Sequence, residues 1–217
     1  MSLPDKERWT ACWRSVGGAG DPEGWYGRLA AAYGEPHRHY HNGQHIAACL
    51  SEFDHARHLA REPAAVELAL WFHDAVYDPK AGDNEERSAE MAGSCLSAAG
   101  LPKPFIERVG ELVRASKCHA AEADSDEAVM VDVDLSILGQ DEKRFAEYEE
   151  QIRREYAWVP ARVFASKRAE ILESFLAREH IFHTELFRER YEASARRNLA
   201  ASIANLKRSS QYRTVDV

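Results

Sequence analysis

The sequence predicts an all-α protein of one domain. Apolar residues recur at helical spacing along nearly the whole chain, and glycine or proline stands where the periodic segments stop. No stretch shows a convincing strand alternation; VMVDVDL at 129–135 is the only run that could form a strand, and its isolation among predicted helices argues against it. A chain of 217 residues suits a single hydrophobic core.

Two helices are expected in the N-terminal part of the chain. Asp21 is suited to cap a helix that opens with Pro22 and ends near Gly34. A second helix should run from Asn42 to about Leu59. Its apolar face is formed by Ile46, Cys49, Leu50 and Phe53.

The third expected helix is the most apolar one. It starts at Glu62–Pro63 and contains AAVELALWFHDAVY, residues 64–77, which is hydrophobic on every side. A helix without a polar face is normally buried, so this segment should be the central helix of the fold.

Helices should also fill the rest of the chain. Asp141 is suited to cap the charged helix EKRFAEYEEQIRREY, and arginine-rich amphipathic helices should follow Pro160 and reach about residue 207. These C-terminal helices either complete the core or form the surface of a homodimer. The other expected helices span residues 84–99, 104–116 and 127–138.

Composition excludes several classes of protein. The formal net charge of −8 argues against a broad nucleic-acid-binding surface, because phosphate backbones select basic patches. The N-terminus has no apolar signal segment, and no apolar run approaches membrane-spanning length. We therefore expect a soluble, cytoplasmic protein. Its four cysteines form no CxxC pair and are expected to be reduced thiols: Cys12, Cys49, Cys95 and Cys118.

His41 and His45 are the first candidates for chemistry. Four residues apart on a helix, they share one face and lie about 6 Å apart along the axis. This spacing suits either two ligands of one metal ion or one ligand beside an acid–base group. An exposed pair is the alternative, because further histidines lie nearby at 37, 39, 55 and 58.

His73 and Asp74 lie in the apolar central helix. A buried imidazole or carboxylate is costly unless a specific partner receives it, and a carboxylate is rarely buried unpaired. Adjacent residues point about 100° apart on a helix, but both can reach an ion between the two directions. Metal binding is therefore favoured here over a core histidine bonded to a carbonyl.

Asp132 and Asp134 cannot both face the same site. Two residues apart on a helix, they point nearly opposite ways. Asp134 is predicted to be the buried ligand, and Asp132, on a more mixed face, is expected either behind a ligand or at the surface. The apolar neighbours of Asp134 at helical spacing are Met130, Val131, Ile137 and Leu138.

His45, His73, Asp74 and Asp134 together form a mixed nitrogen and oxygen donor set. Such donors suit one divalent ion of Mn, Fe, Co, Ni, Zn or Mg and do not choose among these metals. Four protein ligands around an octahedral ion leave two positions for water or substrate oxygens. The set therefore predicts an open site that can activate water.

This constellation resembles the HD superfamily of metal-dependent phosphohydrolases, whose ligands follow the order His, His-Asp, Asp. The resemblance spans about residues 37–139 and implies a helical HD domain with an accessory extension at about 141–208. YHNGQH is also similar to the YHN-x-x-H segment of cyclic-nucleotide phosphodiesterases, and VDLS to their ADLS. By this resemblance His41 matches the general acid, and His45, His73, Asp74 and Asp134 match the ligands one by one.

A bacterial family described only as predicted metal-dependent HD phosphohydrolases is more similar still. The shared runs are YHNGQHI, WFHDAVYDP, NEERSAEM, VDVDLSILG and IRREY, and the label implies no particular substrate. No histidine-rich segment follows the HD pair to hold a second metal, so one ion is expected. Glu85 either orients a ligand or catalytic water, or is one of the acids that favour a helix N-terminus.

A phosphorylated small-molecule substrate would need cationic contacts. Arg38, close to His41 and His45, is the first candidate, with His119 and Arg153 as weaker ones. Most arginines on amphipathic helices merely solvate a face, which is the alternative for each of them.

The leading expectation is a phosphoester hydrolase, with a possibly nucleotide-like substrate. A metal ion would activate water, Asp74 or Asp134 would accept its proton, and His41 would protonate the leaving oxygen. Two alternatives stay open. The site belongs to a non-phosphate HD-type hydrolase, hydratase or oxygenase, or the protein is a non-catalytic metal-binding regulatory module.

Overall fold

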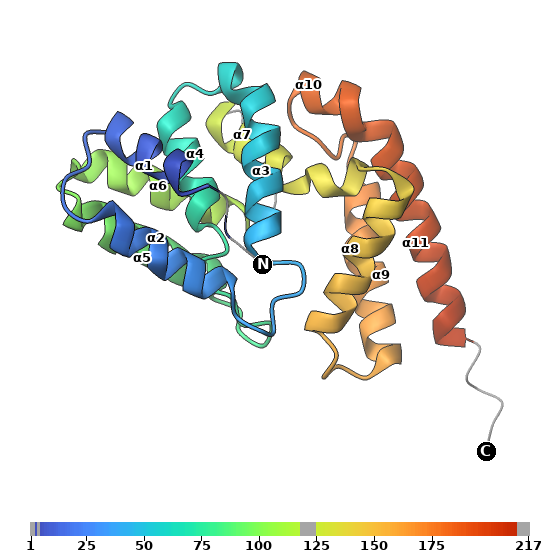
Figure 1. Ribbon diagram of the computed structural model, residues 1–217. Helices are drawn as coiled ribbons and strands as arrows, with labels where there is room; N and C mark the ends of the chain where they lie inside the picture. The colour runs from blue at the N-terminus through green and yellow to red at the C-terminus, as the bar shows by residue number, and fades with distance from the viewer. Residues whose placement is uncertain (1–2, 4, 118–124, 212–217) are drawn as a thin grey trace. The chain divides into compact units, whose positions relative to one another are not determined.

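The computed structural model describes residues 3, 5–117 and 125–211, and every regular element in these ranges is helical. The all-α prediction is confirmed. The chain divides into two compact units, Met1–Asp134 and Leu135–Val217, drawn from blue to yellow-green and from yellow to red in Figure 1. That the two form one domain stays a prediction.

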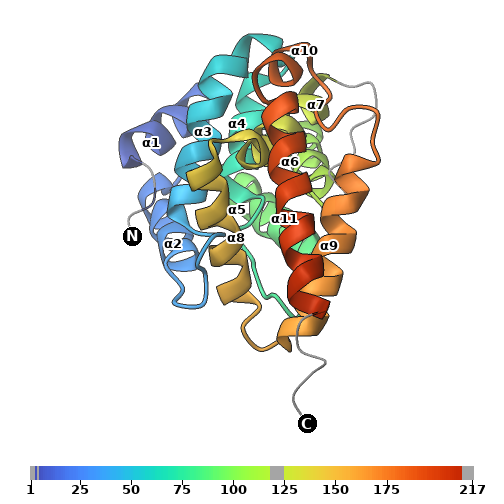
Figure 2. The ribbon, with the colours of Figure 1, turned by 90° about the vertical axis from the view of Figure 1, so that its right-hand side faces the viewer.

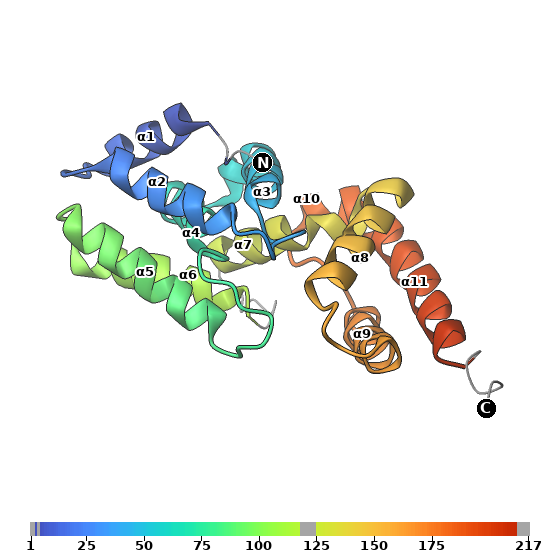
Figure 3. The ribbon, with the colours of Figure 1, turned by 60° about the horizontal axis from the view of Figure 1, so that its bottom comes forward.

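The first unit is built around the predicted apolar helix. Every residue of α4 from Ala65 to Phe72 is buried, as expected for a helix without a polar face. This helix packs against α1, α3, α5 and α6, which surround it in Figure 3. The elements are α1 (Lys6–Ser15), α2 (Pro22–Tyr33), α3 (Gly43–Ala56), η1 (Arg57–Leu59), α4 (Pro63–Phe72), α5 (Asn84–Ala98), α6 (Lys103–Ala115) and α7 (Ser125–Leu135).

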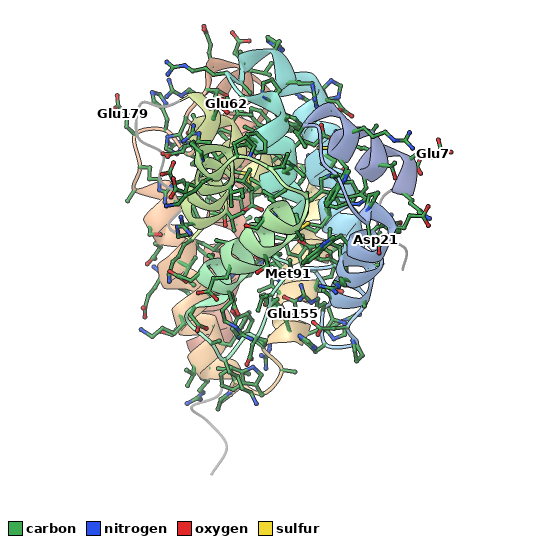
Figure 4. The ribbon with its side chains drawn as sticks, turned by 90° about the vertical axis from the view of Figure 1, so that its left-hand side faces the viewer. Glu7, Asp21, Glu62, Met91, Glu155 and Glu179 are labelled. Atoms are coloured by element: carbon green, nitrogen blue, oxygen red, sulfur yellow. The ribbon has the colours of Figure 1, made fainter. Side chains whose placement is uncertain are left out.

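The cap predicted at Asp21 forms, and Asn42, predicted only as the start of its helix, caps the next one. The Asp21 carboxylate, at the start of α2 in Figure 4, accepts from the N–H of Gly24 at 2.8 Å. The Asn42 side chain accepts from the N–H of Gln44 at 2.8 Å and so opens α3. Such caps satisfy backbone donors that have no partner inside the helix.

Helix α1 was not predicted, although the sequence carries its signal. Asp5 caps it by accepting from the N–H of Glu7 at 2.9 Å. Trp9, Cys12 and Trp13, at positions i, i+3 and i+4, form its buried face.

Trp9 is the centre of an aromatic cluster. Its side chain is 0 % exposed, and its indole N–H donates to the carbonyl of Pro22 at 2.7 Å. The ring centroids of Trp71 and Phe72 lie 5.4 and 5.9 Å from its own. Trp9 therefore joins α1 and α2 to the central helix.

We expect Trp9→Ala to lower the free energy of unfolding by about 3–5 kcal/mol, because it opens a large cavity and removes these aromatic contacts. Urea denaturation followed by circular dichroism measures the loss. Trp158→Ala is the control, because Trp158 is 53 % exposed and its replacement should change the free energy of unfolding by less than about 0.5 kcal/mol. Equal effects of the two substitutions would contradict the central role of Trp9.

The start of α4 is fixed by a carboxylate from α7. Asp126 is 1 % exposed and accepts from the N–H of Arg61 at 2.6 Å and of Glu62 at 3.3 Å. Glu62 is the N-cap residue of α4 and is labelled in Figure 4. The Arg108 guanidinium donates to the same carboxylate at 3.2 Å. A negative charge at a helix N-terminus is stabilising, so α7 helps to place the central helix.

The end of α4 differs from the prediction. The helix ends at Phe72, so His73 is its C-cap residue and Asp74 lies in the following turn instead of on the helix. Beyond this point the backbone bonds to side chains from other segments. The N–H of Val76 donates to Ser88 Oγ at 3.0 Å, and carbonyls of the turn accept from a buried guanidinium. These tertiary hydrogen bonds take the place of those that would continue the helix.

The second unit consists of η2 (Ser136–Gly139), α8 (Glu142–Glu155), α9 (Ala161–Leu176), α10 (Glu185–Phe187), a π-helical turn η3 (Arg188–Glu192) and α11 (Ala193–Gln211). Helices α9 and α11 pack side by side, as Figure 2 shows. Asn198 of α11 donates to the carbonyls of Leu138 and Gln140, both at 2.9 Å, and holds η2. In the ranges that the structure describes, no helix is long and apolar enough to cross a membrane.

Candidate metal centre

Three elements of the first unit bring four donor side chains together. His45 lies in the first turn of α3, His73 caps the C-terminus of α4, Asp74 follows it, and Asp134 is the penultimate residue of α7. The histidines are nearly inaccessible, with His45 4 % and His73 1 % exposed. The predicted ligands therefore do converge, although they are far apart in the sequence.

The Nε2 atoms of the two histidines lie close to each other and to both carboxylates. His45 Nε2 is 3.0 Å from His73 Nε2 and 3.1 Å from Asp134 Oδ1. Asp74 Oδ2 is 3.4 Å from His45 Nε2 and 3.1 Å from His73 Nε2. The separation between His73 Nε2 and Asp134 Oδ1 is 3.5 Å.

These separations fit ligands of one ion. Two donors, each about 2.1 Å from a metal and at a right angle to one another, lie roughly 3.0 Å apart, and the distance grows somewhat in a tetrahedral arrangement. The separations from 3.0 to 3.5 Å have this size. Two imidazoles and two carboxylates are also a donor set that transition metals accept.

The hydrogen bonding of His73 favours the same interpretation. Its Nδ1 lies 3.0 Å from the carbonyl of Leu70, to which it donates as Nδ1–H. The Nε2 atom then faces Asp74 and Asp134. Metal-binding histidines are commonly fixed in this way, with the other ring nitrogen bonded to a backbone carbonyl.

The four side chains form a tightly coupled charge cluster. Burial lowers the pKa of His73, but the negative charges of Asp74 and Asp134 outweigh it and hold this pKa well above its ordinary value. Burial raises the pKa of Asp74, but the positive charges of His73 and His41 outweigh it and hold that pKa well below its ordinary value. A cation bound by the cluster would replace protons as the partner of the carboxylates.

The two carboxylates face the open side of the cluster. The side chains of Asp74 and Asp134 are 19 % and 13 % exposed, whereas those of His45 and His73 are 3 % and 1 % exposed. The approach from solvent is therefore on the carboxylate side. Catalytic metal sites keep such an open position, and structural ones are closed by protein ligands.

Cys49 belongs to the cluster and was missed as a candidate donor. One donor atom from each of His45, Cys49, His73 and Asp134 can be chosen so that all lie within 4.8 Å of one another. The signal was present in the sequence, because Cys49 follows His45 by one helical turn on the predicted buried face.

Asp74 is nevertheless a better fourth ligand than Cys49. The Cys49 sulfur lies 3.6 Å from Nδ1 and 3.7 Å from Nε2 of His45, so it is almost equidistant from the two ring nitrogens. It therefore does not lie along the Nε2 lone pair. An ion about 2.1 Å along that direction would be roughly 4 Å or more from the sulfur, whereas a Zn–S bond is about 2.3 Å.

Asp132 is more buried than expected. It is 0 % exposed, so the alternative that placed it at the surface is wrong. The order of burial is the reverse of the prediction, because Asp134 is only partly buried, with its side chain 13 % exposed, although it does lie against the two histidines. The mixture of polar and apolar residues around Asp132 at helical spacing did not predict that this side chain is buried.

His41 lies beside the donors and not among them. Its ring centroid is 6.1 Å from that of His45, and its charge contributes to the lowered pKa of Asp74. It stacks on Tyr77 at a centroid distance of 4.2 Å and an interplanar angle of 26°. His41 precedes α3, so the helical geometry assumed for the pair 41 and 45 does not hold there.

The other predicted residues are not gathered at the cluster by the contacts described. Arg38 is buried and bonded to backbone carbonyls, and its contact with a substrate stays a prediction. Glu85 is half-buried in the first turn of α5, and its role stays a prediction. Arg153 belongs to the second unit and donates to the carbonyls of Tyr156 and Val159 at 2.5 and 3.1 Å. His119 lies outside the described residues.

In comparisons with known proteins, the chain matched no family model, no curated protein and no solved structure.

Proposed function

We propose that the protein is a metal-dependent hydrolase that cleaves a phosphoester. The observation that carries this proposal is the convergence of His45, His73, Asp74 and Asp134 at separations suited to one ion. Their order along the chain is the one that the resemblance to the HD phosphohydrolases implies. The partial exposure of the two carboxylates supports a catalytic role over a purely structural one.

Each side chain has a distinct role in this proposal. His45 and His73, both buried, would each provide a nitrogen donor once the ion had displaced the ring proton, and Asp74 and Asp134 would provide negative charge. A divalent ion held there would lower the pKa of a water ligand and polarise a phosphate oxygen. Asp74 or Asp134 accepts the proton of the attacking water, and His41 donates a proton to the leaving oxygen.

The test is a metal-resolved activity screen. The protein is stripped with a chelator, loaded separately with Mn, Fe(II), Co, Ni, Zn or Mg, and assayed against phosphomonoesters, phosphodiesters, nucleotides and non-phosphate esters and amides. We expect about one ion per chain by elemental analysis and turnover of a phosphate ester that a chelator abolishes.

Two outcomes would contradict the proposal. Turnover confined to non-phosphate substrates would favour the alternative hydrolase, hydratase or oxygenase. Stoichiometric metal binding that raises the melting temperature, without turnover of any substrate, would favour a structural or regulatory metal.

A further inference from the structure

Arg38 occupies a buried position between two segments that carry site residues. Its side chain is 1 % exposed, and Nε donates to Glu35 Oε2 at 2.9 Å. Nη1 donates to the carbonyls of His41 at 3.2 Å and Asp74 at 2.5 Å. Nη2 donates to the carbonyl of Ala75 at 3.1 Å. One guanidinium thus binds the chain just before α3 to the turn just after α4.

The rigid fork of arginine suits this arrangement. A buried charge is costly unless its hydrogen-bonding groups are satisfied, and here several N–H groups have acceptors. The carbonyls of Asp74 and Ala75 are available because α4 ends before them. Lysine has a compact ammonium and cannot reproduce the planar set of donors.

Tyr77 connects the same guanidinium to the ring of His41. The Arg38 guanidinium carbon lies 5.5 Å from the centroid of Tyr77, and the Tyr77 ring stacks on His41 at 4.2 Å. Arg38 therefore touches the surroundings of His41 both through the backbone and through an aromatic ring.

We propose that Arg38 is a positioning residue that fixes Asp74 relative to His41, and that it does not contact the substrate. Pinning the carbonyl of Asp74 limits the rotation of that residue's backbone and so directs its carboxylate toward His45 and His73. Pinning the carbonyl of His41 does the same for the proposed acid. This inference rests on the proposed metal site and replaces the phosphate contact expected for Arg38.

The test compares Arg38→Lys and Arg38→Gln with a matched control. Arg188→Lys makes the same change in the second unit, where the guanidinium donates to the carbonyls of Phe182 and His183, both at 2.8 Å. The apparent Kd for Zn²⁺ is measured by competition with a chelating dye, and the visible spectrum of the Co²⁺ form reports ligand geometry. Neither the zinc affinity nor the cobalt spectrum requires a substrate.

We expect the Arg38 variants to bind Zn²⁺ about 10–100-fold more weakly and to show an altered Co²⁺ spectrum, as for other residues that orient metal ligands. Arg188→Lys should leave both unchanged. If Arg38→Lys does not fold, Arg38→Gln gives the same readouts. At saturating metal, kcat for bis(p-nitrophenyl) phosphate should fall while KM stays within about twofold of the wild type.

Several results would overturn the inference. Wild-type affinity and spectrum in a folded Arg38 variant would exclude positioning, and so would an equal loss in Arg188→Lys. A raised KM with unchanged kcat and metal affinity would assign Arg38 to the substrate. If the wild-type chain binds no metal, the proposed function fails and this inference fails with it. If the wild type binds metal and the Arg38 variants bind it equally well, only this inference is overturned and the proposed function is unaffected.

Discussion

Asp74→Asn is expected to weaken metal binding by at least about 100-fold and to abolish phosphoester turnover. The substitution removes a negative donor whose Oδ2 lies 3.1 Å from His73 Nε2 and 3.4 Å from His45 Nε2. Replacing a residue that hydrogen-bonds to a metal ligand typically lowers metal affinity 10–100-fold. Replacing a ligand itself should therefore lower the affinity further. Elemental analysis and zinc titration measure the loss of metal binding, and the phosphoester assay measures the loss of turnover.

Asp83→Asn is the matched control for this prediction. Asp83 is exposed, lies in the loop nine residues further along, and makes no side-chain cap to α5. It should leave metal content and turnover unchanged. His73→Ala should reproduce the loss seen in Asp74→Asn, because it removes another member of the same donor group. Full activity and metal content in either ligand variant would end the proposal.

The helices could be predicted because their signals are local. Asp21, Asn42 and Asp141 each cap a helix within a few residues of their own position, and the apolar face of α3 follows a single period. Two of the candidate metal ligands could also be predicted from their local sequence. His73 and Asp74 stand in an apolar segment where a polar side chain needs a partner.

The end of α4 could not be predicted because its cause is tertiary. Nothing in AAVELALWFHDAVY marks Phe72 as the last helical residue. The helix ends where Ser88 and Arg38 take over the backbone groups of the turn, and both belong to other segments. The same contacts bury Arg38, which the sequence presented only as a candidate for a phosphate contact. Its charge was visible in the sequence, but its partners were not.

The place of Cys49 also depended on three-dimensional packing. Periodicity assigned it to the buried face of α3, which is confirmed by an exposed fraction of 2 %. Its closeness to His73 and Asp134 follows from how α4 and α7 approach α3. Periodicity in the sequence identifies the buried face of a helix, but it does not identify the residues of other helices that pack against that face.

His41→Gln is expected to reduce kcat by about 10²–10⁴-fold, the usual contribution of a general acid, while metal binding stays near that of the wild type. The effects on kcat and on metal binding should differ because of where His41 lies. The ring of His41 is 6.1 Å from that of His45 between centroids and stacks on Tyr77, so it flanks the donors without completing them. His58→Gln, in the exposed η1 turn, is the control.

The leaving group distinguishes an acid from other roles of His41. Expulsion of p-nitrophenolate needs little protonation, whereas an aliphatic alkoxide needs a proton in the transition state. The loss in His41→Gln should therefore be small for a p-nitrophenyl ester and large for an alkyl ester of the same phosphate. Equal losses for both esters would assign His41 to orientation of the substrate. A parallel loss of zinc would make it a ligand, which its position beside the four donors argues against.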